Sequence, residues 1–142
     1  MIRVLERLGV PRTLMLGFLA VAIFMTGDGF ELTFLSKFMV DQGFSSSQAS
    51  LLITVYGLFA AFGGWSAGVL AEMFGARKVM MFGACWWIGV HLLFLGVAIP
   101  SHIYPLILGL YAMRGIGYPL FIYSFVVLMA QYISPSRLAS AT

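Results

Sequence analysis

The chain has 142 residues, of which 61% are hydrophobic and only 9% are charged, and its formal net charge is +3. An ordinary soluble domain is about 45–50% apolar and about 25% charged, and it needs that charged surface to stay in solution. Soluble enzymes, nucleic-acid-binding proteins, disordered tails and secreted disulfide scaffolds are therefore excluded. The composition leaves an integral membrane protein.

Four apolar segments follow one another along the chain. Each is long enough to cross a hydrocarbon core about 30 Å thick, which takes about 20 helical residues. The segments are unbroken and do not alternate as barrel strands do, so helices are predicted. The predicted membrane-spanning helices cover residues 14–40, 48–74, 79–99 and 104–133. Between them lie a loop in which a serine at 45–47 can cap the second helix, a glycine and basic turn at 75–78, and a proline-bounded loop at 100–105.

The basic residues gather on one side of these four spans. Three precede the first span, two follow the second and one follows the fourth: Arg3, Arg7, Arg12, Arg77, Lys78 and Arg137. On the other side only Lys37 lies near a helix end. Because loops rich in Lys and Arg stay in the cytoplasm, both termini are predicted to be cytoplasmic, in a cell inner (plasma) membrane. Residues 1–13 are then a cytoplasmic segment, and residues 134–142 resemble the start of a cytoplasmic connection in a chain that continues.

Three charged side chains fall deep inside the predicted spans, away from the helix ends. The helical rise of about 1.5 Å per residue places Asp28, Glu31 and Arg114 in one layer near the middle of the membrane. Asp28 and Glu31 are three residues apart and share a helix face. Two acids and one base predict an ion pair plus a spare carboxylate, or a carboxylate free to take a proton. Such groups usually mark transport pathways, and the alternative is a buried salt bridge that only fixes helix packing.

Small residues and one histidine complete the mid-membrane features. His91 lies near the middle of the third span, where a packed or hydrogen-bonded side chain is expected. Ala60, Gly64 and Gly68 recur every four residues in the second span and predict a close helix neighbour. A cluster after the arginine of the fourth span predicts a bend or local unwinding beside a cavity. That cluster is Gly115, Gly117, Tyr118 and Pro119.

The turn after the second span carries a motif. It reads Gly68-Val-Leu-Ala-Glu72-Met-Phe-Gly75-Ala-Arg77-Lys78. It resembles the signature loop of the major facilitator superfamily, G-x-L-x-D-x-x-G-R-[KR], with Glu72 in place of the usual Asp and Ala76 in place of a common Arg. Gly75 can end the helix with a positive φ, whereas the charge of Glu72 is disfavoured in a last turn and needs a positive partner. The resemblance implies a cytoplasmic gate latch whose acid contacts the opposite half of a transporter.

The first and fourth spans extend the resemblance. The stretch from Arg114 to Pro119 is similar to the family's arginine and glycine pattern. Proton-coupled sugar porters of the superfamily pair a first-helix acid with a fourth-helix arginine, which implies Asp28 and Arg114 here. Together with the latch, Gly27-Asp28-Gly29-Phe30-Glu31 resembles the polyol permease group, which carries pentitols such as ribitol and arabinitol. The resemblance covers nearly the whole chain but only about the first third of a twelve-helix transporter, and so implies further C-terminal helices.

The predicted fold class is therefore all-α and integral to the membrane, with four helices that form the first part of a twelve-helix fold. The predicted function is secondary active transport, as proton-coupled uptake of a polyol or sugar by alternating access. The alternatives are a self-contained four-helix dimeric transporter of the small multidrug type, or a non-transporting membrane subunit, which would leave the mid-membrane charges unexplained. The sequence shows no nucleophile, metal-ligand cluster or phosphate loop, so no enzyme, metal or cofactor is expected. The expected partners are the lipid bilayer, a small polar solute and protons, without nucleic acid.

Overall fold

A computed structural model describes residues 12–132 of the chain, which form four long helical rods. The elements are α2 (Arg12–Asp41), α3 (Ser46–Phe74), α4 (Ala76–Leu93), the π-helical turn η1 (Phe94–Ala98), α5 (Ile99–Ser101) and α6 (Tyr104–Tyr132). Each rod is long and apolar enough to cross a bilayer, with α4, η1 and α5 forming the third. The described residues contain no strand. The prediction of an all-α membrane fold with four spanning helices is confirmed.

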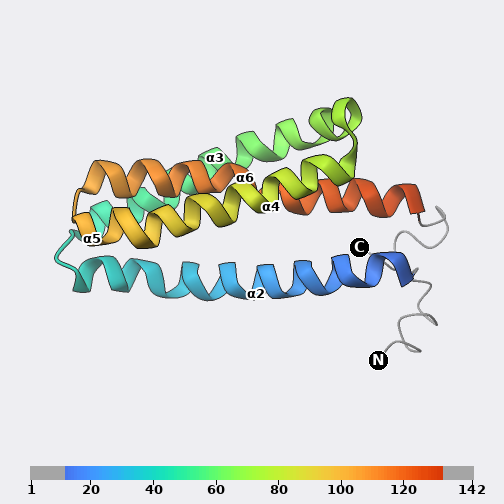
Figure 1. The fold of residues 1–142 in the computed structure, drawn as a ribbon. Helices are drawn as coiled ribbons and strands as arrows, with labels where there is room; N and C mark the ends of the chain where they lie inside the picture. Colours follow the sequence, from blue (N-terminus) through green and yellow to red (C-terminus); the bar gives the residue numbers. More distant parts are fainter. Residues whose placement is uncertain (1–11, 133–142) are drawn as a thin grey trace.

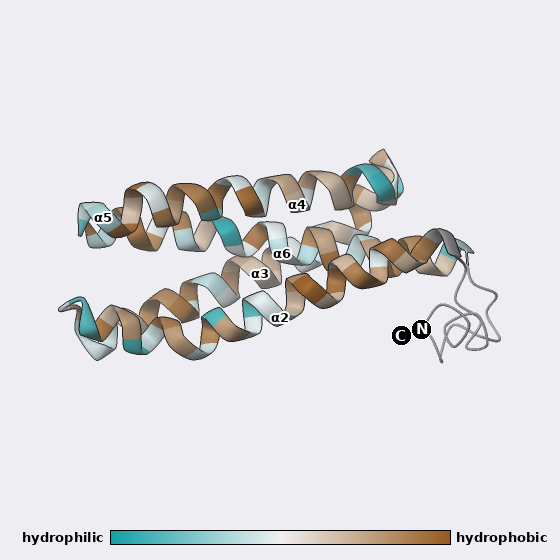
Figure 2. Cartoon of the chain, turned by 60° about the horizontal axis from the view of Figure 1, so that its bottom comes forward, coloured by the Kyte–Doolittle hydropathy of each residue, from teal (hydrophilic) through white to brown (hydrophobic). Residues whose placement is uncertain are grey.

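Rods that follow one another in the chain are antiparallel. In Figure 1 the α2–α3 and α5–α6 connections lie at one end of the molecule, and the α3–α4 turn lies at the other. Figure 2 shows that apolar colours dominate the helices, with hydrophilic colours at their ends and in a few short stretches. The predicted basic residues Arg3, Arg7 and Arg137 and the predicted connection at 134–142 lie outside the described residues.

The ends of α3 are fixed by local chemistry. Ser45 Oγ accepts a hydrogen bond from the Gln48 backbone N–H at 3.2 Å, and Gln48 Oε1 accepts one from the Ser45 N–H at 2.9 Å. This reciprocal capping box confirms the predicted serine cap. At the other end Gly75 has φ 90° and donates its N–H to the Ala71 carbonyl at 3.0 Å. Because Gly75 alone makes the turn, α4 already begins at Ala76, whereas the sequence predicts a turn through residue 78.

Helix α6 forms the centre of the fold. It packs along α3 on one side and α4 on the other, while α2 contacts α3 more than it contacts α6. The approach to α4 is close, since a Cβ added at Gly83 would lie 2.7 Å from the backbone nitrogen of Phe121. A Cβ at Gly63 of α3 would lie 2.9 Å from the carbonyl oxygen of Ile116. These glycines allow the backbones to touch.

The predicted stripe of small residues is only partly correct. A Cβ at Gly64 would lie 2.9 Å from the ring of Tyr123, but one at Gly68 would meet no atom within 4 Å. Gly63, which the four-residue spacing did not select, approaches α6 more closely than Gly64 does, since its Cβ would lie 2.7 Å from Pro119 Cγ. The reason is the rotation of α3 about its own axis, which turns the residue next to the predicted stripe toward α6.

Helix α6 stays helical through its glycine cluster. The element runs from Tyr104 to Tyr132 without interruption, with Pro119 inside it, so of the predicted bend or local unwinding, the unwinding is not found and the bend stays a prediction. Added Cβ atoms would lie 2.6 Å from the Tyr56 carbonyl oxygen at Gly115 and 2.9 Å from Trp87 Cβ at Gly117. The glycines therefore serve close packing on two sides of α6 rather than a break in the helix.

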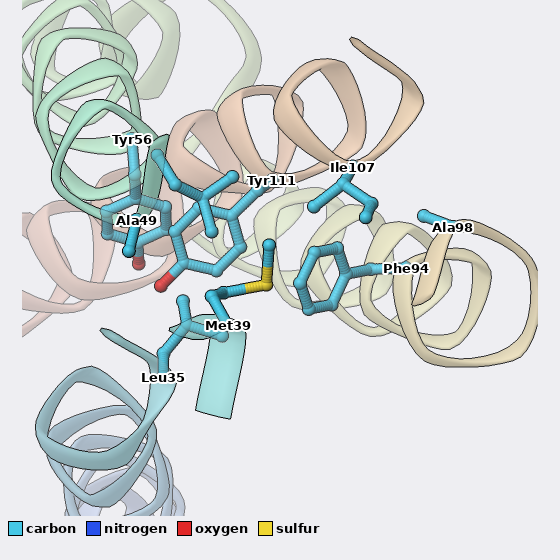
Figure 3. Close-up of a cluster of buried hydrophobic side chains, with 9 residues drawn as sticks. Leu35, Met39, Ala49, Tyr56, Phe94, Ala98, Ile107 and Tyr111 are labelled. Atoms are coloured by element: carbon cyan, nitrogen blue, oxygen red, sulfur yellow. The ribbon is translucent and has the colours of Figure 1, made fainter. Parts of the chain in front are cut away.

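A cluster of buried side chains joins all four rods (Figure 3). It comprises Leu35, Met39, Ala49, Leu52, Tyr56, Phe94, Ala98, Ile107 and Tyr111. Met39 from α2 and Phe94 from η1 are almost completely buried in it. The two tyrosine rings lie 4.9 Å apart, centroid to centroid. Because Tyr56 and Tyr111 also contact the charged residues, this cluster supports one side of the site described next.

Candidate functional site

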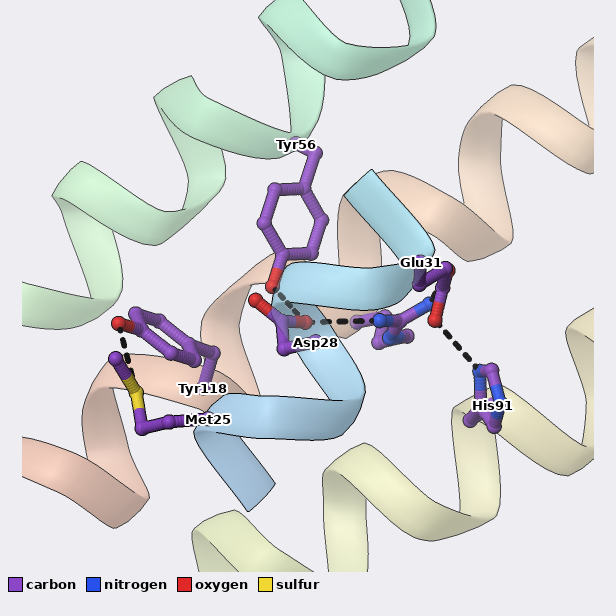
Figure 4. Close-up of polar contacts among 7 residues, drawn as sticks. Met25, Asp28, Glu31, Tyr56, His91 and Tyr118 are labelled. Carbon is purple, nitrogen blue, oxygen red and sulfur yellow. Dashed lines mark hydrogen bonds and ion pairs between the residues drawn. The ribbon is translucent and has the colours of Figure 1, made fainter. Parts of the chain in front are cut away.

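The three mid-membrane charges predicted from the sequence come together in one site. Asp28 and Glu31 project from α2 (Figure 4), and Arg114 belongs to α6. Arg114 is completely buried, and Asp28 is 6% exposed. A charge at this depth is costly unless it is paired, so the contacts among these three side chains decide how the site can work.

Arg114 contacts both carboxylates. Its Nη2 donates to Asp28 Oδ1 at 3.0 Å, and its Nη1 donates to Glu31 Oε1. The expectation of one ion pair plus a spare carboxylate is therefore wrong, because a single guanidinium has two donor edges and serves both acids. The three side chains carry one more negative than positive charge when all are ionised. That excess gives the site the capacity to accept a proton.

Aromatic side chains enclose the arginine. The guanidinium carbon lies 4.4 Å from the ring centroid of Trp87, 5.1 Å from that of Tyr111 and 5.7 Å from that of Tyr56. Tyr56 also donates its hydroxyl to Asp28 Oδ1 at 3.2 Å. Sequence reasoning missed both tyrosines as site residues. Both lie at a depth close to that of the charges in the second and fourth spans, but the sequence does not show which way their side chains face.

His91 stands at the other edge of the site. Its Nδ1 lies 3.9 Å from Glu31 Oε2, and its ring stacks on Trp87 with centroids 4.9 Å apart. The neighbouring Trp86 donates its indole N–H to the Met113 carbonyl at 2.8 Å, which links α4 to α6. The packed histidine that the sequence predicts is thus a neighbour of the charged groups.

The residues after the glycines of α6 line a cavity. Tyr118 donates its hydroxyl to Met25 Sδ at 3.5 Å. Together with Pro119 it borders a cavity of about 410 Å³ between α3 and α6. The remaining lining residues are Ala60, Ala61, Gly64, Trp65 and Tyr123. This cavity lies apart from the charged residues, none of which is among its lining residues.

The predicted latch residues lie at and around the α3–α4 turn. Gly75 has the positive φ predicted for it, and Glu72, Arg77 and Lys78 are exposed. Among the described residues Glu72 forms no ion pair, so its predicted positive partner is not found within 12–132. Among residues 12–132, no atom lies within 4 Å of a Cβ added at the latch glycine Gly68. The described residues also contain no cluster of His, Cys, Asp and Glu side chains that could hold a metal ion.

Comparison with known proteins adds the family. The chain is 46% identical over 134 residues to a D-arabinitol transporter and 45% identical over 133 residues to a ribitol transporter, both of Klebsiella pneumoniae. It is 42% identical over 138 residues to an alpha-ketoglutarate permease of Bacillus subtilis (strain 168). These alignments cover 94%, 94% and 97% of this chain but only 32%, 31% and 32% of the relatives. The chain therefore spans about a third of the length of these relatives, none of which is named as an enzyme.

No solved structure matches the chain significantly. The sequence profile described as Major Facilitator Superfamily matches residues 17–142. That range includes the buried site on α2 and α6 and the glycine turn between α3 and α4. With four apolar helices, the signature turn and the match over most of its length, this chain belongs to the major facilitator superfamily.

Proposed function

We propose that these 142 residues form the first four helices of a secondary active transporter, in which Asp28, Glu31 and Arg114 couple solute movement to proton movement. The observation that carries the proposal is the fully buried guanidinium shared by two carboxylates of another helix. Family membership supports transport as the activity. The chain spans about a third of its relatives, so the proposed transporter includes further helices of the same polypeptide.

The coupling follows from two opposing effects on the carboxylates. Burial disfavours a charged carboxylate, whereas a nearby arginine favours it. Helix α2 contacts α6 much less than α3 and α4 do, so α2 is the element best able to move relative to Arg114. When such a movement lengthens one of the ion pairs, the released carboxylate takes up a proton. The reverse movement returns the proton on the other side of the membrane.

The proposed solute is a small polyol, with an organic acid as the second candidate. The support comes from the relatives, two of which are named as transporters of D-arabinitol and ribitol and one as an alpha-ketoglutarate permease. A neutral polyol leaves the charge of the site unchanged when it binds. A dicarboxylate would add negative charge beside two acids that already outnumber the arginine, which favours the polyol.

In the proposed orientation the α3–α4 turn and both termini of these 142 residues lie on the cytoplasmic side. The proposed membrane is the plasma membrane. Arg77 and Lys78 at that turn support this orientation through the positive-inside rule. At the other end the basic residue Lys37 is paired with Asp41 at 2.8 Å. In this orientation exposed Glu72 is available to a partner on the other half of the transporter, as the proposed gate latch requires.

Uptake by the full-length protein that contains these residues tests the proposal. The protein is reconstituted in vesicles and offered labelled D-arabinitol, ribitol and alpha-ketoglutarate with and without an inward proton gradient. We expect gradient-driven accumulation of a pentitol, and its loss in at least one of the variants Asp28→Asn and Glu31→Gln, while some solute exchange remains. The matched control Asp41→Asn removes an exposed carboxylate from the end of the same helix.

Two results would contradict the proposal. Normal accumulation in both Asp28→Asn and Glu31→Gln would make the buried acids structural. Saturable uptake by residues 1–142 alone would instead support the self-contained dimer. In the proposed transporter the solute site lies between two six-helix halves, so four helices alone should not transport.

A further inference from the structure

The two oxygens of Glu31 face different partners. Oε1 accepts from Arg114 Nη1, and Oε2 lies 3.9 Å from His91 Nδ1 (Figure 4). Both contacts of Asp28, by contrast, involve Oδ1 alone, which accepts from Arg114 and Tyr56. Glu31 therefore connects the buried arginine to a second basic side chain, whereas Asp28 does not.

The imidazole of His91 packs against two aromatic rings. Its ring stacks on Trp87 at an interplanar angle of 19°, and Trp87 in turn lies against Arg114. The ring of Phe94 is also stacked with the imidazole, with centroids 6.4 Å apart. Among the described residues Nδ1 is buried and has no hydrogen-bond partner. The nitrogen nearest Glu31 is thus the one whose hydrogen-bonding capacity the packing leaves unused.

Glu31 and His91 form the accessible edge of the charged site. Their side chains are 20% and 23% exposed, against 8% for Asp28 and 0% for Arg114. They also line a cavity of about 350 Å³. Its other lining residues, all apolar, are Phe34, Leu35, Phe38, Phe94, Leu95 and Ile99. A proton that enters along this cavity meets His91 and Glu31 before it meets Arg114 or Asp28.

We propose that Glu31, rather than Asp28, is the carboxylate that exchanges its proton, and that His91 is the positioning residue that delivers the proton to it from this cavity. The inference rests on the proposed transport function and names the carrier within it. Asp28 then stays paired with Arg114 and Tyr56 and keeps the arginine in place. His91 acts through Glu31 and does not itself contact Arg114 through a hydrogen bond.

The proton balance of the step is simple. A hydronium ion in the cavity gives one proton to the neutral imidazole and becomes water. The imidazolium then donates its Nδ1 proton to Glu31 Oε2 after closing the 3.9 Å gap or through one bridging water. His91 returns to neutral, Glu31 becomes neutral, and Arg114 is left paired with Asp28 alone.

Several titratable groups surround His91 and set its response to pH. Helix α2 contributes Asp28 and Glu31, and α6 contributes Arg114, against whose guanidinium the Tyr111 ring lies. From α3, Tyr56 faces the site through its bond to Asp28. The π-helical turn η1 contains no titratable residue. Glu31 is the acid nearest the imidazole, which makes it the acceptor of the proton.

The test compares two variants of His91 in the full-length protein. His91→Asn keeps a nitrogen donor near the Nδ1 position but cannot titrate, and His91→Phe keeps the ring stack without any nitrogen. We expect the ratio of gradient-driven uptake to solute exchange to fall at least tenfold in both, with a changed pH profile. His102→Asn, in the exposed loop before α6, is the matched control and should keep the wild-type ratio and profile.

The outcomes separate this inference from the transport proposal. A wild-type ratio and pH profile in His91→Asn would overturn the role of His91, even if His91→Phe is inactive, because that pattern indicates packing alone. Wild-type protein that exchanges solute without any gradient-driven uptake would overturn the proposed coupling itself.

A second measurement does not depend on the histidine variants. Infrared difference spectra between acidic and alkaline pH show the carbonyl band of a carboxyl group that gains a proton. We expect Glu31→Gln to remove that band and Asp28→Asn to keep it. Loss of the band in Asp28→Asn with its retention in Glu31→Gln would assign the proton to the other carboxylate and overturn the inference.

Discussion

Replacing Arg114 by Met measures how strongly the buried site holds α2 to α6. The substitution keeps an unbranched side chain of similar reach and removes the positive charge from two carboxylates. Arg114 is 0% exposed and Asp28 is 6% exposed, so water compensates little of the loss. Removing one partner of a buried ion pair costs about 3–5 kcal/mol. We expect the free energy of unfolding of Arg114→Met to fall by that amount.

The matched triple variant is Asp28→Leu, Glu31→Met and Arg114→Met. Replacing every member of a buried charge cluster by well-packed hydrophobic residues of similar volume is often neutral or stabilising by about 1–4 kcal/mol. We therefore expect the triple variant to recover at least half of the stability that the single variant loses, while it remains unable to accumulate solute. Stability without transport would show that the charges are kept for coupling and not for packing.

The assay is reversible unfolding of the full-length protein by dodecyl sulfate in mixed micelles, followed by circular dichroism. Lys37→Met is the control, because the Lys37 and Asp41 side chains are 77% and 58% exposed. An exposed pair of this kind contributes about 0–1 kcal/mol. The reasoning would be refuted if the triple variant were as unstable as Arg114→Met, or if Arg114→Met were as stable as Lys37→Met.

Three other predictions concern packing, the buried acid and the latch. Gly83→Ala should lower the free energy of unfolding by about 1–3 kcal/mol in the same assay, because its Cβ would lie 2.7 Å from the backbone of Phe121; Gly89→Ala, where no atom lies within 4 Å, should not, and equal stability of the two would contradict the contact. Tyr56→Phe removes the hydroxyl that bonds Asp28 and should cost about 1.5–3 kcal/mol, the range for hydrogen bonds to charged groups; an unchanged unfolding curve would mean that the bond contributes nothing. Glu72→Ala should slow solute uptake by the full-length protein while membrane insertion, measured by the amount of protein in the membrane, stays normal; a wild-type uptake rate would remove the gating role.

The common depth of the three charged residues could be predicted from the sequence. A helical rise is the same for every residue, so counting along α2 and α6 places Asp28, Glu31 and Arg114 in one layer. Depth alone does not give the rotation of a helix about its axis. The tyrosines Tyr56 and Tyr111 were missed for this reason, since an apolar helix shows no polar face that would fix which side is turned inward.

The glycines show the same limit of sequence reasoning. The motif identified Gly75 because a turn with φ 90° has few other solutions. The local unwinding predicted as one alternative near Gly115 and Gly117 is not found, because glycine serves both irregular helix geometry and close packing in membrane helices. Only the neighbours, Tyr56 on one side and Trp87 on the other, decide between these two uses.

The long separation between the acids and their arginine also bears on how the protein is made. Glu31 and Asp28 precede Arg114 by 83 and 86 positions, so α2 leaves the ribosome well before its cation has been synthesised. Until then each ionised acid costs about 2.5–3.5 kcal/mol in the centre of the bilayer. This cost lowers the stability of the nascent α2 in lipid until α6 supplies the arginine that pairs with both acids. The ion pairs that join α2 to α6 thus form only after the fourth rod has been synthesised.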